Sequence, residues 1–336
     1  MPPIRDVMPA FELFQPASIT DALGVLNRHG ADAWVMAGGM DTFDWLKDRI
    51  KQPRVVVDLG MVNELRGIKD AAGGLEIGAM TTLTTIANDP MVKERFPLLA
   101  QAALIVASPQ IRNQGTLGGN VAQDARCWYY RAGWPCYRAG GNICYADTPT
   151  AINREHAIFN ADRCVAVNPS DTAPALIALD AQFVIKNGDA ERVVSADEFF
   201  VGPGIDITKL TSLQPGDLLT AIRIPNTFAG KAHYFEKVRD RQVWDFALVN
   251  IAASFNMSGA SIGDARMIVN GVSATPYRLS AVEAFLRGKS RDKATADAAA
   301  DMAVEGAVVL QHNGYKVPLM KALVKRAIRG DAEWTS

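Results

Sequence analysis

All four cysteines of this 336-residue chain lie in one short segment. They are Cys127, Cys136, Cys144 and Cys164, with gaps of eight, seven and nineteen residues between them. Four thiolates are the ligand set that a 4Fe–4S cluster needs. The gaps match neither a compact ferredoxin pattern nor the paired Cys-x-x-Cys of zinc ribbons. Spacing alone therefore supports a shared metal site and four unrelated thiols about equally, and zinc is the structural alternative to an iron–sulfur cluster.

Two glycine-containing stretches suggest a second kind of chemistry. They are Ala37-Gly-Gly-Met-Asp-Thr42 and a longer polar stretch, residues 108–120, which we expect to be a loop. Glycine lets the main chain approach a bound group closely, and backbone N–H groups at strand ends can bind phosphate. An isolated Gly-Gly is usually an ordinary turn, and the Gly-x-Gly-x-x-Gly fingerprint is absent from both stretches. Two such stretches with Asp41 and Asn120 beside them favour a cofactor that carries a pyrophosphate.

Hydrophobic periodicity predicts the elements that hold these stretches. A strand at 33–36 runs into the first stretch, and a helix at 41–50 and a strand at 54–59 complete a β-α-β unit. Asn187-Gly188 is a hairpin signal, and Ser18, Thr82 and Asp89 are expected helix N-caps. Further strands are expected at 75–79, 182–186, 192–195, 217–224, 248–255 and 266–271, and further helices at 91–107, 279–286, 295–310 and 319–328.

These elements predict an α+β fold with two domains, residues 1–228 and a smaller α+β domain at 229–336, joined through a linker at 226–231. The cysteine segment, residues 124–165, has no clear period and is expected to be an irregular insert in the first domain. A loop of this length without secondary structure is usually functional or disordered.

Bulk composition describes an ordinary globular protein. Apolar residues make up 49% of the chain, charged residues 21%, and the net charge is −1, so nothing favours nucleic acid or an anionic membrane. No apolar run reaches the length of a transmembrane helix, and residues 1–9 have no signal-peptide core. We therefore expect a cytoplasmic protein with reduced thiols, or a periplasmic one exported together with a signal-bearing partner.

Five motifs in the same order resemble the flavin-binding medium subunits of the molybdenum hydroxylases, the xanthine dehydrogenase and carbon monoxide dehydrogenase family. Together they span nearly the whole chain. They are Ala37–Asp41, Ile111–Asn120, Ser170–Ala181, Phe235–Arg239 followed by Asp245-Phe-Ala247, and Gly271–Arg278. One departure is Met40, where the family usually has threonine, so that a hydroxyl contact to the cofactor is lost while backbone contacts can remain.

The resemblance implies the two-subdomain FAD-binding fold of the vanillyl-alcohol-oxidase type, and therefore bound FAD. It implies no acid–base catalyst in this chain, and Lys237 would bring positive charge near the flavin. The residues expected to bind FAD are Val35, Met36, Ala37, Gly38, Gly39, Met40, Asp41, Thr42, Ala107, Thr116, Gly119, Asn120, Gln123, Asp171, Leu219 and Lys237.

The insert is similar to that of 4-hydroxybenzoyl-CoA reductase and of a bacterial aldehyde oxidoreductase, whose medium subunits hold an extra 4Fe–4S cluster. The resemblance thus implies that the four cysteines bind such a cluster. It also implies a heterotrimer with a large molybdenum-cofactor subunit and a small subunit carrying 2Fe–2S clusters. This chain would pass electrons between those clusters and an external carrier such as ferredoxin, NAD, a quinone or oxygen.

Two other hypotheses remain open from the sequence. A self-sufficient FAD oxidase or dehydrogenase would need a substrate domain and a catalytic base over the flavin, and no base stands out. A zinc-stapled interaction module with vestigial nucleotide loops would contain stoichiometric zinc and no chromophore. The histidines make no metal-binding spacing, and only His156 lies inside the insert.

Overall fold

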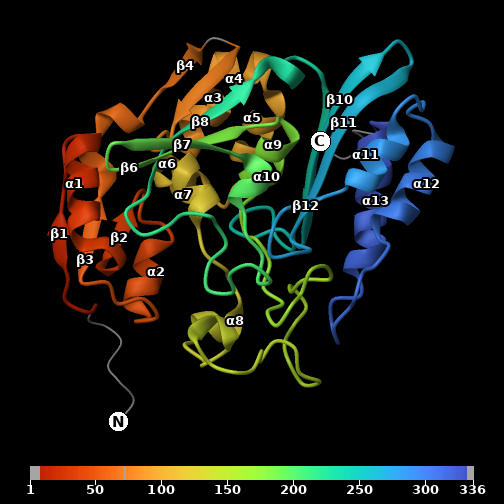
Figure 1. Ribbon diagram of the computed structural model, residues 1–336. Coiled ribbons are helices and arrows are strands. Elements are labelled where there is room, and N and C mark those ends of the chain that lie inside the picture. Colours follow the sequence, from red (N-terminus) through yellow and green to blue (C-terminus); the bar gives the residue numbers. More distant parts are fainter. Residues whose placement is uncertain (1–7, 72, 331–336) are drawn as a thin grey trace.

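The computed structural model describes residues 8–71 and 73–330, and the strands of this part form three sheets. Figure 1 shows the first domain with two of these sheets beside the C-terminal domain, and the cysteine insert at the lower end of both. The ends of the predicted domains, residues 1–7 and 331–336, lie outside the described residues. No described helix is long and apolar enough to cross a membrane.

The first sheet positions the first glycine stretch. Its three strands are parallel, in the order β1 (Glu12–Phe14), β3 (Val55–Asp58), β2 (Ala33–Met36). The helices of this region are α1 (Ile19–His29) and α2 (Thr42–Lys47). Ser18 caps α1 by accepting the N–H of Asp21 at 3.0 Å, as predicted. Because β2 ends at Met36, the chain enters Gly38-Gly39 directly from a strand end, also as predicted.

The second sheet forms the wall behind the second glycine stretch. Its five antiparallel strands are ordered β4 (Ile68–Ala71), β5 (Gly74–Gly78), β8 (Leu218–Pro225), β6 (Gln182–Asn187), β7 (Ala190–Ser195). The predicted hairpin is confirmed, and Gly188 takes a φ of 56° at its turn. The helices packed on this sheet or beside it are α3 (Leu83–Asn88), α4 (Pro90–Arg95), α5 (Pro97–Leu104), α9 (Thr172–Ala178) and α10 (Ala196–Phe199).

The stretch predicted as a loop, residues 108–120, is instead two short helices, α6 (Pro109–Gln114) and α7 (Leu117–Ala122). Ser108 and Thr116 are their N-caps, and the Thr116 hydroxyl accepts the N–H of Gly119 at 3.1 Å. The single helix expected at 91–107 is likewise divided, because Pro97 begins a new helix. Caps at Thr82 and Asp89 are confirmed.

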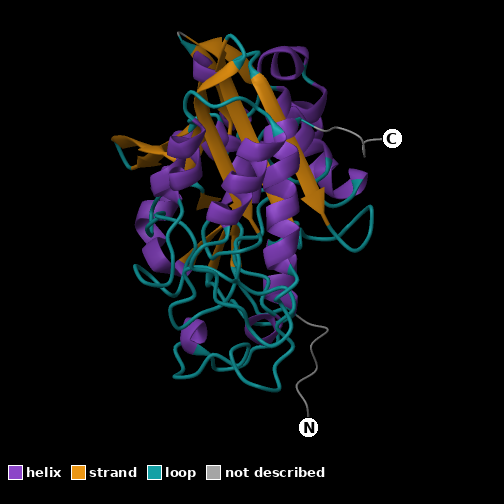
Figure 2. Ribbon diagram, turned by 90° about the vertical axis from the view of Figure 1, so that its right-hand side faces the viewer, coloured by secondary structure: helices purple, strands orange, loops and turns teal. Residues whose placement is uncertain are grey.

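The C-terminal domain is a four-stranded antiparallel sheet covered by helices (Figure 2). Its strands are β9 (Ala232–Val238), β10 (Val249–Ser258), β11 (Ser261–Asn270) and β12 (Tyr277–Arg278). Its helices are α11 (Ser280–Leu286), α12 (Lys293–Ala303) and α13 (Lys316–Arg329). The prediction of a helix at 295–310 is wrong at its C-terminal end. The helix ends at Ala303, and Gly306 takes a φ of 76°.

The insert is mostly irregular, as predicted, with one short α-helix, α8 (Trp128–Arg131), and a 3-10 helix at Tyr137–Ala139. Side chains of the C-terminal domain bind the second half of the insert. Asn313 Nδ2 donates to the carbonyl oxygens of His156 and Ala157, both at 3.0 Å. The fully buried Lys316 donates from Nζ to the carbonyls of Glu155 at 2.8 Å and Gly271 at 2.5 Å. The insert is therefore held by side chains more than 150 positions away in the sequence.

Burial lowers the pKa of Lys316 to about 7, and this predicts a pH dependence of stability. Between pH 7 and 10 the unfolded chain keeps a proton that the folded chain has lost, so the free energy of unfolding rises with pH. The contribution is at most about 1.4 kcal/mol per pH unit. Urea unfolding of the wild type and of Lys316→Met at pH 7.5 and 8.5 checks this. Equal pH slopes for the two proteins contradict the assignment.

Candidate functional site

The two glycine stretches meet around a cavity of about 440 Å³, here called the glycine-loop cavity. Its walls come mainly from residues 34–44 and 106–123 and from the loop at 244–246. Thirteen of the sixteen residues predicted to bind FAD line it. The structure thus brings together side chains and backbone from three separate parts of the sequence at one cleft.

The other three predicted residues do not line this cavity. Leu219 is 7% exposed and packs in the main core of the first domain. Met36 is the last residue of β2, and Lys237 lies on β9 behind Asp171. Their assignment to FAD remains a prediction that the cavity does not support directly.

Close backbone approach between the two stretches explains why glycine is needed here. A Cβ atom at Gly38 would lie 2.0 Å from the carbonyl oxygen of Gln114. Gly39 has a φ of 77°, which other residues rarely adopt. Glycines from both stretches line the glycine-loop cavity, where main-chain groups can approach the diphosphate and ribityl chain of FAD, so the residues present fit this cofactor.

Gly38→Ala is expected to lower the free energy of unfolding by about 1–3 kcal/mol and to weaken FAD binding, because the two stretches must move apart. Gly24→Ala is the matched control. Gly24 lies in α1, and no atom comes within 4 Å of the place that an added methyl group would take, so alanine there is neutral or slightly stabilising. Urea unfolding and flavin fluorescence titration measure both effects. Equal behaviour of the two variants contradicts the close-approach argument.

A buried ion pair closes one side of the glycine-loop cavity. Lys237 Nζ lies 2.5 Å from Asp171 Oδ2, and these side chains are 1% and 4% exposed. Asn250 Nδ2 donates to the other carboxylate oxygen at 2.9 Å. Burial raises the pKa of Asp171, while Lys237 and Asn250 act in the opposite direction. Asp171 is the N-cap residue of α9 but makes no side-chain capping bond, so its side chain serves the ion pair instead.

Asn120 is fixed at the same wall. Its Oδ1 accepts hydrogen bonds from the hydroxyls of Ser170 and Thr172, both at 2.7 Å. These bonds orient the side-chain amide at the cavity and tie the second glycine stretch to the start of α9.

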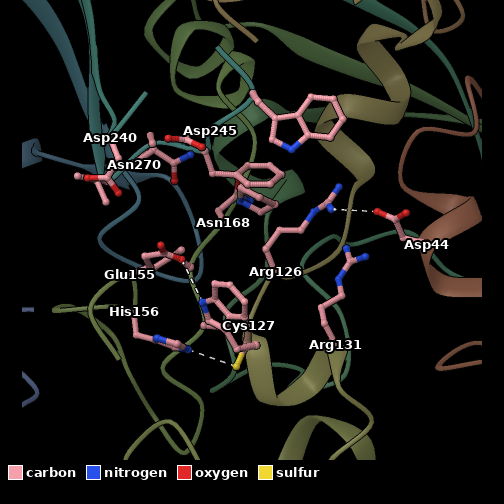
Figure 3. A pocket seen from close by; sticks show the side chains of 18 of the residues that line it. Asp44, Arg126, Cys127, Arg131, Glu155, His156, Asn168, Asp240, Asp245 and Asn270 are labelled. Carbon is pink, nitrogen blue, oxygen red and sulfur yellow. Dashed lines mark hydrogen bonds and ion pairs between the residues drawn. The ribbon is translucent and has the colours of Figure 1, made fainter. Parts of the chain in front are cut away.

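A second cavity, of about 770 Å³, lies between the first domain, the insert and the loop at 240–248, and is here called the interdomain cavity (Figure 3). Arg126, Trp244 and Phe246 line both this and the glycine-loop cavity. The Arg126 guanidinium lies over the Phe246 ring at 4.7 Å. The two cavities are therefore neighbours, and the wall that they share also contains Asp44, Pro169 and Asp245.

Sequence reasoning did not assign Arg126, Trp244 and Phe246 to the site. Trp244 takes a φ of 75° and donates its backbone N–H to the carbonyl of Ala107, which itself has a φ of 42°. Such left-handed backbone at non-glycine residues often accompanies functional sites. The motif Asp245-Phe246-Ala247 was a usable signal, because it belongs to the family pattern.

All four cysteines line a third, small cavity, here called the cysteine cavity. Cys136 and Cys164 are buried, and aromatic side chains from Tyr129, Tyr130, Tyr137 and Tyr145 form part of its wall. Burial raises the pKa of Cys127 to about 11 and also raises that of Cys164. These two thiols are therefore protonated at neutral pH, and metal binding would release their protons.

The spacing of these thiols bears on the type of metal. Among the described residues, no three His, Cys, Asp or Glu side chains converge closely enough to hold a single ion. Four thiolates around one Zn²⁺ at about 2.3 Å would have to lie within about 4 Å of one another. In a 4Fe–4S cluster each thiolate binds a different iron, so the sulfurs stay further apart. All four cysteines nevertheless line the one cysteine cavity.

Asp41, at the end of the first glycine stretch, joins that stretch to the insert. Its Oδ1 lies 2.6 Å from Arg131 Nη2 and 2.9 Å from Arg126 Nη2. Its Oδ2 accepts from Trp45 Nε1 at 3.1 Å and from the backbone N–H of Asp124 at 3.3 Å. Three of these four donors come from residues flanking Cys127, so one carboxylate anchors the first part of the insert.

A second ion pair holds another part of the insert. Arg138, only 5% exposed, pairs with Asp124 and donates to the carbonyl of Ile207 at 2.9 Å. Trp45 is fully buried and packs with Cys136 and Cys164 in one apolar cluster. Arg126, Arg131 and Arg138 are thus largely buried structural partners and not solvated surface charges.

Comparison with known proteins is consistent with this arrangement. Residues 9–227 match the family described as the FAD binding domain in molybdopterin dehydrogenase, and residues 233–330 match the CO dehydrogenase flavoprotein C-terminal domain. The carbon monoxide dehydrogenase medium chain of Hydrogenophaga pseudoflava is 31% identical over 333 residues, 98% of each chain. The aldehyde oxidoreductase FAD-binding subunit PaoB of Escherichia coli is 35% identical over 257 residues, 75% of this chain and 78% of that one.

Solved structures agree with the sequence relatives. A chain of the H. pseudoflava carbon monoxide dehydrogenase that lacks the Mo-pyranopterin moiety superimposes with a TM-score of 0.75 at 30% identity, covering 96% of this chain and 97% of that one. The predicted α+β architecture, a FAD-binding domain followed by a smaller C-terminal domain, is thereby confirmed. The chain therefore belongs to the family of FAD-binding subunits of the molybdenum hydroxylases.

Proposed function

We propose that this chain is the FAD- and 4Fe–4S-containing electron-transfer subunit of a heteromeric molybdenum-dependent oxidoreductase. Bound FAD supplies the exchange between one-electron and two-electron carriers. The observation that carries the cluster assignment is the convergence of Cys127, Cys136, Cys144 and Cys164 on one cavity. Cys127 lines both the cysteine cavity and the interdomain cavity, and the interdomain cavity lies next to the flavin site.

The chain's own residues would have three tasks. The glycine stretches bind the diphosphate, the Asp171–Lys237 pair fixes the wall beside the flavin, and the insert keeps water from the cluster. None of these tasks requires an acid–base catalyst, so substrate chemistry is assigned to a large molybdenum-cofactor subunit. A small subunit with 2Fe–2S clusters would exchange electrons with this chain, and ferredoxin, NAD, a quinone or oxygen would be the external carrier.

The names of two relatives support this assignment. The H. pseudoflava chain is called a medium chain, which indicates further subunits, and PaoB is called the FAD-binding subunit of an aldehyde oxidoreductase. A zinc-stapled interaction module is disfavoured because residues 9–227 match a FAD-binding family and residues 233–330 match a flavoprotein family. A self-sufficient oxidase is disfavoured because both domains match subunit families. We place the complex in the cytoplasm, or in the periplasm if a partner carries the export signal.

Electron paramagnetic resonance of the dithionite-reduced complex tests the proposal. A 4Fe–4S signal is expected in addition to those of two 2Fe–2S centres. Cys144→Ser is expected to remove this additional signal and leave the flavin content unchanged, because Cys144 lines neither the glycine-loop nor the interdomain cavity. Identical spectra for wild type and variant would refute the assignment of the cysteines.

A further inference from the structure

Cys127 differs from the other three cysteines in its surroundings. All four lie in the described part of the chain, and Cys127 alone lines the interdomain cavity as well as the cysteine cavity. It is therefore the proposed cluster ligand that faces the cavity adjoining the flavin site. His156 meets it there, with Nε2 3.3 Å from Cys127 Sγ, as the dashed line in Figure 3 marks.

The chemistry of the two groups determines which one donates the hydrogen bond. A ligating thiolate carries no proton, so it can only accept a hydrogen bond. Nε2 must then carry the imidazole proton and donate it to Sγ. The other ring nitrogen, Nδ1, is buried without a partner, so nothing within the described residues competes for a different tautomer.

The position of the His156 ring is set by the main chain on both sides of it. The His156 N–H donates to the carbonyl of Asn153 at 3.2 Å, and its own carbonyl accepts from Asn313 at 3.0 Å. The residue is 3% exposed. The C-terminal domain thus fixes the main chain from which the buried imidazole contacts Cys127.

We propose that His156 is a positioning residue that donates Nε2–H to Cys127 Sγ and raises the reduction potential of the proposed cluster. A hydrogen bond to a ligating sulfur stabilises the reduced, more negative cluster more than the oxidised one. Acting at the flavin-facing ligand, this bond favours electron residence on the cluster rather than on FAD. The inference rests on the proposed 4Fe–4S site and adds a role for a residue that is not a ligand.

Potentiometric titration of the whole complex, followed by electron paramagnetic resonance, tests this role. His156→Leu removes the donor, and the equilibrium constant for cluster reduction is expected to fall about tenfold, which is about 59 mV for one electron. His156→Gln can place an amide N–H near the position of Nε2 and is expected to restore most of the shift. His312→Gln is the control, since His312 is an exposed histidine of the same region and its substitution should leave the potential unchanged.

An unchanged potential in His156→Leu with the cluster intact would overturn the inference while leaving the proposed function standing. If His156→Leu fails to assemble, pulsed resonance of the reduced wild-type complex labelled with ¹⁵N-histidine decides the question. A histidine nitrogen coupled to the cluster is expected, and its absence overturns the inference. A wild-type complex with no 4Fe–4S signal at all would instead overturn the proposed function.

Discussion

Lys237→Met is expected to lower the free energy of unfolding by about 3–5 kcal/mol, because it leaves the buried carboxylate of Asp171 without its counter-charge. The two side chains are 1% and 4% exposed, and the amide of Asn250 would remain as the carboxylate's hydrogen-bond partner. FAD binding should weaken as well, since Asp171 lines the glycine-loop cavity. Urea unfolding and flavin titration measure both consequences.

The stability of this variant should also depend on pH in a defined direction. Burial raises the pKa of Asp171 above its unfolded value, and removing Lys237 raises it further. The folded state then binds more protons than the unfolded state, so stability is retained at low pH and lost as pH rises. Lys237→Met is thus expected to be closer to wild type at pH 5 than at pH 8.

Two further variants make the result interpretable. Lys237→Met combined with Asp171→Asn removes both charges and should recover much of the lost stability. Lys231→Met changes an exposed lysine and should stay within about 0.5 kcal/mol of wild type. If the double variant is no more stable than Lys237→Met alone, the loss does not come from an uncompensated charge.

Asp41→Ala is expected to destabilise the chain by about 3 kcal/mol and to loosen the flavin site and the cysteine insert together. The carboxylate has four donors, and three of them belong to Asp124, Arg126 and Arg131. Without it, two largely buried guanidinium groups lose their main partner. FAD affinity should fall by about tenfold or more, and Cys127 should become more open to alkylation.

Asp41→Asn separates charge from hydrogen bonding. The amide oxygen can still accept from Trp45 or from the backbone of Asp124, so an intermediate loss is expected. Asp32→Ala is the control, because Asp32 is exposed and its ion pair with Arg54 is 4.0 Å long. Flavin titration combined with mass-spectrometric mapping of alkylated cysteines measures the outcome. A variant that loses FAD affinity while Cys127 stays protected would show that the two sites are not joined through Asp41.

Local patterns in the sequence predicted the parts of the fold that local physics decides. The strand ending at Met36, the cap at Ser18 and the turn at Gly188 each follow from a few neighbouring residues. The family resemblance then named half of the residues around the glycine-loop cavity, since thirteen of the sixteen residues expected to bind FAD line it. The insert was predicted to be irregular because its sequence has no clear hydrophobic period, and this is a local property as well.

Contacts between distant residues were not predictable in the same way. Nothing near Asp41 in the sequence indicates that its carboxylate binds Arg126 and Arg131, about 90 positions later. Nor does the sequence around His156 reveal its contact with Cys127. The glycines at 115–119 suggested a loop, but the Ser-Pro at 108–109 and the cap at Thr116 start two helices instead. At residues 108–120 the helix caps decided the local structure despite the glycines. At Asp41 and His156 the contacts come from residues far away in the sequence.

Iron, acid-labile sulfide, molybdenum and flavin quantified on one sample of the natively isolated complex test the central claim most directly. A 4Fe–4S cluster in this chain and two 2Fe–2S clusters in a partner predict about eight iron and eight sulfide per FAD. About four iron per FAD would contradict the cluster assignment. Stoichiometric zinc with no flavin would contradict the account as a whole.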